Sequence, residues 1–310
     1  MRGGIRLLAR TLACGMVAGV TTLSGCVMTQ PARTGPLVPP AELAVERVSF
    51  ASPSGGTIRG WYLRGDTGKG AVLLLHGVGS NRSSMVDRAR FLHRAGYTVL
   101  LPDFQAHGES DGDHITFGSL ESLDANAALQ FLRTCTAGEP IAAIGVSMGG
   151  AAALLGPRPL EVDALVLESV YPTIRQALED RLAVWLGPLG GLNHWVAPLL
   201  IREVSSEIGV REDALRPIDR IAGAGAPIFV LSGTRDSYTP LSEARALFSQ
   251  ARGPKEFWAV EGAKHEDLHA FARAAYEQRV GAFLAKYLRN APRPAGAIAG
   301  APAACRDEGA

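Results

Sequence analysis

The chain has 310 residues, a length that one large α/β domain can account for. Hydrophobic residues make up 47% of the chain and charged residues 20%, which is typical of a globular protein with a sizeable core. The formal net charge is +1 and no basic stripe with interleaved aromatic residues is present, so nucleic acid is not an expected partner. No Cys/His cluster has zinc spacing, and we expect neither a metal nor an organic cofactor.

The first 26 residues have the pattern of a secretion signal. A positively charged start precedes an apolar run over residues 11–23, which is shorter than the about 20 residues of a spanning helix. The run ends in Leu-Ser-Gly-Cys at 23–26, which resembles the lipobox of bacterial lipoproteins. The resemblance implies a lipidated Cys26 that anchors the protein to a membrane of the bacterial cell envelope, and Val27 favours the outer membrane. An ordinary secretory signal with a chance cysteine is the alternative.

Two segments flank the expected folded domain. Residues 27–43 contain four prolines with little periodicity, and they are predicted to be a Pro-rich linker. Residues 291–310 are rich in Ala, Gly and Pro and lack large apolar side chains, so we predict a disordered tail. The folded domain is therefore expected over residues 44–290.

Strand-like and helix-like patterns alternate within this domain. Two strand patterns, 45–50 and 57–63, flank a Gly-rich turn. Continuous apolar runs predict strands buried on both faces of a parallel sheet, at 71–75, 97–101, 140–146, 164–167 and 227–231. Apolar stripes with helical spacing lie between or after them, within 120–131, 241–248 and 268–288. This alternation predicts an α/β fold with a doubly wound, mostly parallel sheet, whose ligands bind at the carboxyl ends of the strands.

A G-x-S-x-G motif spans residues 145–149 and contains Ser147. It follows the apolar run 140–146 and leads into a helix-forming run at 150–155, the strand–turn–helix context of a nucleophile elbow. The flanking glycines allow a tight turn that exposes the Ser147 hydroxyl above the sheet. A Gly-rich turn with an incidental serine is the alternative interpretation.

A serine hydroxyl needs a base to accept its proton, and His265 is the best placed of seven histidines. It follows a predicted last strand at 255–261, in a loop at the carboxyl edge of the sheet. His269, one helical turn later, is expected on a helix surface. His107 and His114, in another loop, remain alternatives for the base.

The base in turn needs a carboxylate that fixes its tautomer. Asp236 comes shortly after the strand predicted at 227–231, at the same edge of the sheet. A turn residue that caps the next helix is the alternative interpretation of Asp236. Glu168, after the preceding strand, is the substitute acid.

The oxyanion of a tetrahedral intermediate needs hydrogen-bond donors. The N–H of Met148, directly after the nucleophile, is one expected donor. The second is expected from the loop after the strand at 71–75, where Val78 is our choice and Gly79 the alternate. His76 in the same loop is expected to be a structural hydrogen-bonding residue.

These motifs together resemble the α/β-hydrolase superfamily, most closely its serine aminopeptidase-like and monoglyceride-lipase-like branch. The resemblance covers roughly residues 44–290, and the absence of an H-G-G-G run disfavours the hormone-sensitive-lipase group. It implies an α/β-hydrolase fold, a triad of Ser147, Asp236 and His265, and a helical cap inserted at 171–225. The matching residues are His76-Gly77-x-Gly79, Asp103-Phe104-x-x-His107-Gly108-x-Ser110, Gly145-x-Ser147-x-Gly149, Gly233-x-x-Asp236 and His265.

The cap is rich in large apolar residues. They either form an apolar roof over an acyl pocket or pack as a stripe on the sheet. We expect a serine hydrolase that cleaves a small-molecule carboxylic ester or thioester through an acyl-enzyme. An aminopeptidase is the alternative enzyme, with Glu168, Glu179 and Asp180 available to hold a substrate amine. A non-catalytic membrane-tethered binding protein is the third hypothesis, and the complete triad argues against it.

Overall fold

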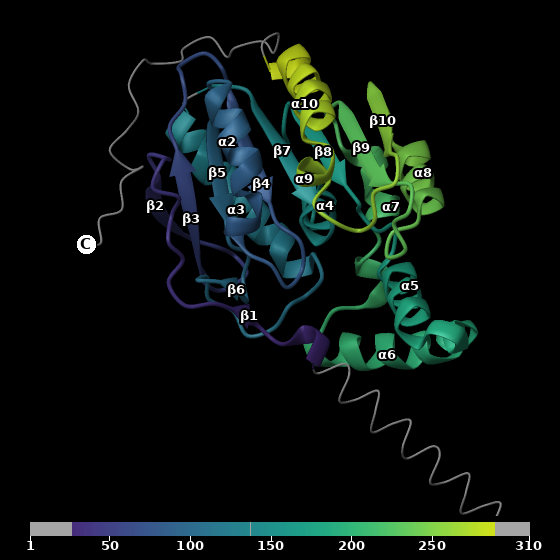
Figure 1. The fold of residues 1–310 in the computed structure, drawn as a ribbon. Helices are drawn as coiled ribbons and strands as arrows, with labels where there is room; N and C mark the ends of the chain where they lie inside the picture. Colours follow the sequence, from purple (N-terminus) through teal and green to yellow (C-terminus); the bar gives the residue numbers. More distant parts are fainter. Residues whose placement is uncertain (1–26, 137, 289–310) are drawn as a thin grey trace, which may run out of the picture.

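The computed structural model describes residues 27–136 and 138–288 (Figure 1). The predicted signal peptide with its lipidated Cys26 and the predicted tail at 291–310 lie outside the described residues.

An eight-stranded sheet forms the centre, in the order β10-β9-β8-β7-β4-β5-β3-β2 (Figure 1). Strand β3 runs antiparallel to its neighbours β2 and β5, and the other neighbouring strands are parallel. This arrangement confirms the predicted fold class. The strands are β2 (Glu46–Ala51), β3 (Thr57–Leu63), β4 (Ala71–Leu75), β5 (Thr98–Pro102), β7 (Ile141–Val146), β8 (Ala164–Glu168), β9 (Ile228–Gly233) and β10 (Lys255–Val260).

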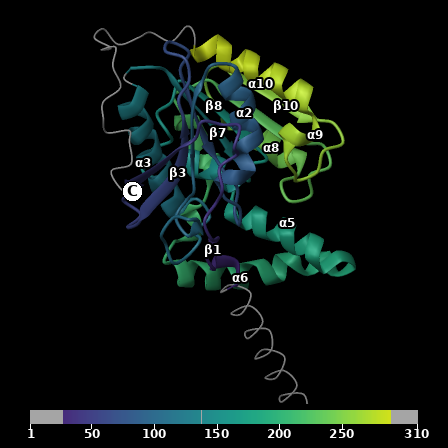
Figure 2. The ribbon, with the colours of Figure 1, turned by 60° about the vertical axis from the view of Figure 1, so that its left-hand side comes forward.

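Helices cover both faces of the sheet (Figure 2). Because side chains alternate along a strand, Leu73 and Leu75 of β4 enter one apolar core, whereas Val72 and Leu74 enter the other. The first core packs against α3 (Ser119–Thr136), α4 (Met148–Leu154), α7 (Pro217–Arg220) and α8 (Leu241–Gln250). The second packs against α2 (Val86–Arg94), α9 (Leu268–Phe271) and α10 (Arg273–Leu288).

The segment 27–43, predicted as a Pro-rich linker, packs on the domain at its strand β1 (Ala32–Arg33). This strand pairs in parallel with β6 (His107–Gly108) in the loop after β5. Thr29 is buried, and its carbonyl accepts a hydrogen bond from the Ile115 N–H at 2.8 Å. The backbone of this segment finds partners distant in sequence, which side-chain periodicity does not report.

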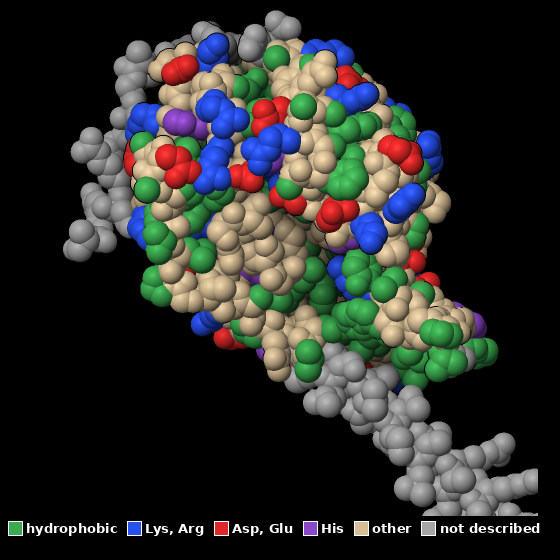
Figure 3. Space-filling model, in the orientation of Figure 1, with side chains coloured by type: hydrophobic (Ala, Val, Ile, Leu, Met, Phe, Trp, Pro, Cys, Tyr) green, Lys and Arg blue, Asp and Glu red, His purple; other side chains and the backbone are tan. Residues whose placement is uncertain are grey.

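The cap insert follows β8 and forms a helical hairpin below the sheet (Figure 1). It contains α5 (Ile174–Leu186), η2 (Gly187–Leu192), α6 (Asn193–Ile208) and η3 (Glu212–Ala214). Thr173 caps α5 by accepting a hydrogen bond from the Gln176 N–H. Both cap helices bury one face in the first core, whereas apolar side chains also gather on the outside of the cap (Figure 3). The exposed ones are Val184, Trp185, Leu189, Trp195 and Leu199.

Candidate active site

Ser147 lies in the sharp turn between β7 and α4. Its backbone angles are φ 49° and ψ −115°, and its side chain lies in the wall of a cavity of about 250 Å³. A non-glycine residue in this conformation costs on the order of 1–3 kcal/mol, and such strain persists where the surroundings impose it. The flanking glycines allow the turn because a Cβ on Gly145 would lie 2.5 Å from Gly150 Cα, and one on Gly149 would lie 2.3 Å from the Leu75 carbonyl oxygen.

His265 and Asp236 come from the loops after β10 and β9, and their side chains meet. The His265 Nδ1–H donates to Asp236 Oδ2 at 2.8 Å, which leaves Nε2 as the basic nitrogen. The other carboxylate oxygen accepts from the Tyr238 N–H at 2.9 Å and the Thr239 N–H at 2.8 Å. His265 lines the same cavity as Ser147. The structure therefore brings together the three residues that the sequence analysis selected.

Asp236 is held in its ionised form. Burial opposes ionisation, but the hydrogen bonds from His265 and Thr239 outweigh it, so the pKa of Asp236 lies below its ordinary value. Thr239 contributes twice, because its hydroxyl also donates to Asp236 Oδ2 at 2.7 Å. Sequence reasoning missed Thr239, and its only signal was its position three residues after the acid.

The two expected oxyanion donors lie beside the nucleophile. Met148 is the first residue of α4, so its N–H belongs to the helix end that has no intrahelical acceptor. Val78 lines the cavity together with Ser147. The alternate, Gly79, already donates its N–H to His107 Nε2 at 3.1 Å, which favours Val78 over Gly79.

His76 and His107 are structural. The His76 Nδ1–H donates to the Gly77 carbonyl at 2.8 Å, and its Nε2 accepts from the Phe104 N–H at 3.1 Å. His107 likewise donates from Nδ1 to a backbone carbonyl at 2.8 Å and accepts at Nε2. Burial lowers the pKa of His76 to about 3 and also lowers the pKa of His107. With both ring nitrogens occupied, neither side chain can serve as the base. His114 is exposed.

Glu168 does not contact His265 and instead forms a buried ion pair. Its oxygens accept from Arg88 Nε at 3.1 Å and Arg88 Nη2 at 2.7 Å, and it also hydrogen-bonds the Tyr276 hydroxyl. Arg88 Nη2 also lies 2.9 Å from Asp267, two residues after His265. Glu168 is thus part of a network that holds the His265 loop, a role that one sequence cannot reveal because its members come from β8, α2, α10 and the loop before α9.

The expectation that His269 lies on a helix surface is wrong. It belongs to α9, but its side chain is buried against the Phe91 ring, with centroids 5.9 Å apart. Its Nε2 lies 3.1 Å from Glu277 Oε1. The short helix turns this residue inward, toward α2 and α10 rather than toward the nucleophile.

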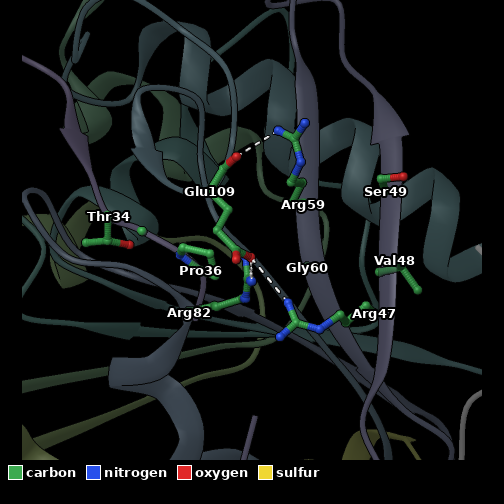
Figure 4. A pocket seen from close by; sticks show the side chains of 10 residues that line it. Thr34, Pro36, Arg47, Val48, Ser49, Arg59, Gly60, Arg82 and Glu109 are labelled. Carbon is green, nitrogen blue, oxygen red and sulfur yellow. Dashed lines mark hydrogen bonds and ion pairs between the residues drawn. The ribbon is translucent and has the colours of Figure 1, made fainter. Parts of the chain in front are cut away.

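A larger cavity of about 450 Å³ lies between residues 34–36 and the β2–β3 hairpin (Figure 4). It shares no lining residue with the cavity of the nucleophile. Glu109 reaches across it, forming an ion pair with Arg82 and lying 3.7 Å from Arg47. The Glu109 carbonyl also accepts from Arg59 at 2.7 Å. We interpret this cavity as a gap in the packing between the N-terminal segment and the sheet.

Comparison with known proteins identifies the family. Residues 66–207 match the family model described as serine aminopeptidase, S33. The uncharacterized protein Rv2307c of Mycobacterium tuberculosis is 30% identical over 226 residues, which are 71% of this chain and 72% of that protein. The α/β-hydrolase domain-containing protein WAV2 of Arabidopsis thaliana is 26% identical over 259 residues, covering 79% and 80% of the two chains.

Solved structures show the same fold. An esterase of Pyrococcus furiosus superposes with a TM-score of 0.70 at 22% identity, covering 84% of this chain and 98% of that one. An esterase of Exiguobacterium antarcticum gives a TM-score of 0.58 at 18% identity, covering 76% and 98%. The protein belongs to the α/β-hydrolase superfamily, which confirms the resemblance seen in its motifs, and it is accordingly a hydrolase.

Proposed function

We propose that this protein is a serine esterase that cleaves a carboxylic ester or thioester through an acyl-enzyme. Ser147 Oγ attacks the carbonyl carbon while His265 Nε2 accepts its proton, and Asp236 stabilises the imidazolium. The N–H groups of Val78 and Met148 stabilise the oxyanion. His265 then gives the proton to the departing alcohol or thiol. Water attacks the acyl-enzyme with His265 as base, releasing the acid and restoring Ser147.

The main support for this proposal is that Ser147, in a strained backbone conformation, lines the same cavity as His265. The His265 ring is in turn oriented by its hydrogen bond to Asp236. A serine kept at positive φ has no structural use in a turn that glycine would form more easily. This favours an enzyme over a binding protein on the same fold.

The acids of the site favour an ester over a peptide substrate. An aminopeptidase needs a carboxylate to hold the substrate's amine, but Glu168 is paired with Arg88. Asp180 forms a hydrogen bond with Glu243 outside the cavity, and Glu179 does not line the cavity. Of the acids that do line it, Asp267 is paired with Arg88, and Glu266 is exposed at the rim.

The test compares p-nitrophenyl esters of increasing acyl length with aminoacyl p-nitroanilides. The purified domain is expected to hydrolyse the esters with an optimum at one acyl length. The Ser147→Ala variant, with an unchanged melting temperature, is expected to lose at least about 10⁴-fold in kcat. Full activity in the variant would remove Ser147 as nucleophile, whereas Ser147-dependent cleavage of anilides alone would establish the peptidase.

We also propose that Cys26 is lipidated and anchors the protein in a membrane of the bacterial cell envelope, with the outer membrane favoured in a Gram-negative cell. Val27, the first described residue, is exposed, and the helical turn over residues 27–29 lies beside α6 (Figures 1 and 2). The cap also exposes two tryptophans, Trp185 and Trp195, and tryptophan suits the membrane interface. None of the described helices has the length and apolarity to cross a bilayer.

A disulfide supports an extracytoplasmic location. Cys135 is disulfide-bonded, and disulfides persist in oxidising compartments such as the periplasm. Expression of the full chain in a bacterium tests the anchor. The wild type is expected in the membrane fraction with a diacylglyceryl mass on its first residue, and Cys26→Ser in the soluble fraction. A mature N-terminus at another residue without lipid would overturn the proposal.

A further inference from the structure

Ser169 is a buried polar residue that the proposed reaction does not use. It follows β8 directly and adopts a positive φ of 48°, which is unfavourable for a residue with a Cβ. The residue is 2% exposed, and its hydroxyl has no hydrogen-bond partner among residues 27–136 and 138–288. Ser169 nevertheless lines the cavity of the nucleophile. A strained, unpartnered hydroxyl at a cavity wall points to a partner that enters from outside.

Arg181 lines the same cavity from the cap. Its guanidinium packs over the Tyr238 ring at 5.2 Å from the centroid, and Tyr238 in turn packs edge-on against His265 at 5.6 Å. Within the described part of the chain, no carboxylate lies within 4.0 Å of its nitrogen atoms. Burial lowers the pKa of Arg181, but an arginine remains charged at neutral pH.

The two carboxylates whose charge acts on Arg181 are committed elsewhere. Asp236, whose charge acts on Arg181, is hydrogen-bonded to His265, and Asp180 shares a hydrogen bond with Glu243. The other arginine of the cavity, Arg88, is fully paired with Glu168 and Asp267. Arg181 is therefore a half-buried cation that faces the reaction cavity without a compensating contact ion.

The strand register places Ser169 next to the nucleophile. Val146 of β7 is paired with Glu168 of β8, so Ser147 and Ser169 leave neighbouring strands side by side. The Ser147 N–H also donates to the Glu168 carbonyl at 2.8 Å. Because neighbouring strands lie about 4.8 Å apart, a group bound at Ser169 would be only a few bonds from the carbonyl that Ser147 attacks.

We propose that Ser169 and Arg181 form a subsite for a carboxylate carried by the substrate, so that the preferred substrates are acidic esters. The guanidinium offers two parallel N–H donors to a carboxylate, and the Ser169 hydroxyl offers a third. This inference rests on the esterase function proposed above and specifies its substrate class.

The experiment uses length-matched substrates that differ only in the terminal charge. Mono-p-nitrophenyl glutarate and adipate are compared with p-nitrophenyl pentanoate and hexanoate, after subtraction of the rate without enzyme. The wild type is expected to prefer the acidic esters. Arg181→Gln is expected to lower kcat/KM for the acidic esters about 10- to 100-fold and to change that for the neutral esters less than about threefold.

Three further variants separate recognition from folding. Ser169→Ala is expected to lower kcat/KM for the acidic esters about 3- to 10-fold, and Arg181→Lys to restore part of the loss of Arg181→Gln. Arg202→Gln removes an exposed arginine on α6 outside the cavity, and it is expected to leave kcat/KM unchanged for both the acidic and the neutral esters. Melting curves report whether each variant is folded.

Two outcomes would overturn the subsite. In the first, Arg181→Gln lowers kcat/KM for the acidic and the neutral esters equally. In the second, Arg181→Gln lowers kcat/KM for neither class, while Ser147-dependent cleavage of neutral esters persists. If no ester is cleaved at all, the proposed function fails instead. In that case calorimetric binding of glutarate to the wild type and to Arg181→Gln tests the subsite alone, and equal binding to both would remove it.

Discussion

Asp236 and Glu168 were alternative candidates for the acid that orients His265, and the structure predicts opposite effects when each is replaced by its amide. Glu168 and Arg88 have side chains 1% and 2% exposed, and removing one partner of such a pair costs about 3–5 kcal/mol. Because Asp267 still contacts Arg88 at 2.9 Å, Glu168→Gln is expected to cost about 3 kcal/mol, toward the lower limit. At about 2–4 °C per kcal/mol, the melting temperature would fall by about 6–12 °C. The folded variant should retain kcat/KM within about threefold at 25 °C.

Asp236→Asn is expected to show the reverse behaviour. The amide keeps the shape of the side chain, so the melting temperature should change by only a few degrees. Loss of the charge and of the fixed histidine tautomer should lower kcat by about 10³- to 10⁴-fold. Scanning calorimetry and ester hydrolysis on the same two preparations measure both effects. The reasoning is refuted if Glu168→Gln melts like the wild type and loses as much activity as Asp236→Asn.

Two further predictions concern the pH dependence of stability and the oxyanion donors. Burial and the neighbouring Asp180 raise the pKa of Glu243 from 4.5 to about 8, so its contribution to stability is complete below pH 4.5 and lost as the pH rises through 8. Glu243→Gln should therefore raise the melting temperature by a few degrees at pH 8.5. Calorimetry from pH 5 to 9 measures the melting temperatures of the wild type and the variant, and a constant difference between them over this range would contradict the prediction. Val78→Pro removes an N–H and should lower kcat about 10²- to 10³-fold, whereas Val78→Ala should keep it within about threefold; equal kinetics would exclude this donor.

The parts of the fold that could be predicted are those that local chemistry determines. Each strand of a parallel sheet is buried on both faces, so it appears as an uninterrupted apolar run, and β4 and β7 were found with bounds correct to within one residue. The nucleophile was recognisable because the tight turn at Ser147 permits only glycine at Gly145 and Gly149. Both signals are contained within a few consecutive residues.

The parts that could not be predicted depend on contacts between distant segments. The pairing of β1 with β6 joins residues about 75 positions apart through backbone atoms alone, and no side-chain pattern records it. The inward position of His269 depends on how α9 packs against α2, which a helical period cannot show. Glu168 was a reasonable substitute acid by position, and only the location of Arg88 assigns it to a different role.

Arg181 combines a feature that the sequence pattern predicts, its position on a helix face, with one that only the structure shows, the absence of a contact carboxylate in the described chain. It follows Ala177 by four residues and Leu178 by three, so helical geometry places it on the buried face of α5. A charged residue on such a face requires a partner, because an unpaired buried charge is costly. The contrast with Arg175 on the same helix is direct, since Arg175 hydrogen-bonds Glu212 at 2.7 Å. The described chain offers Arg181 no contact carboxylate, and the cavity it faces is the one that receives the substrate. The missing partner is therefore expected to arrive with the ester.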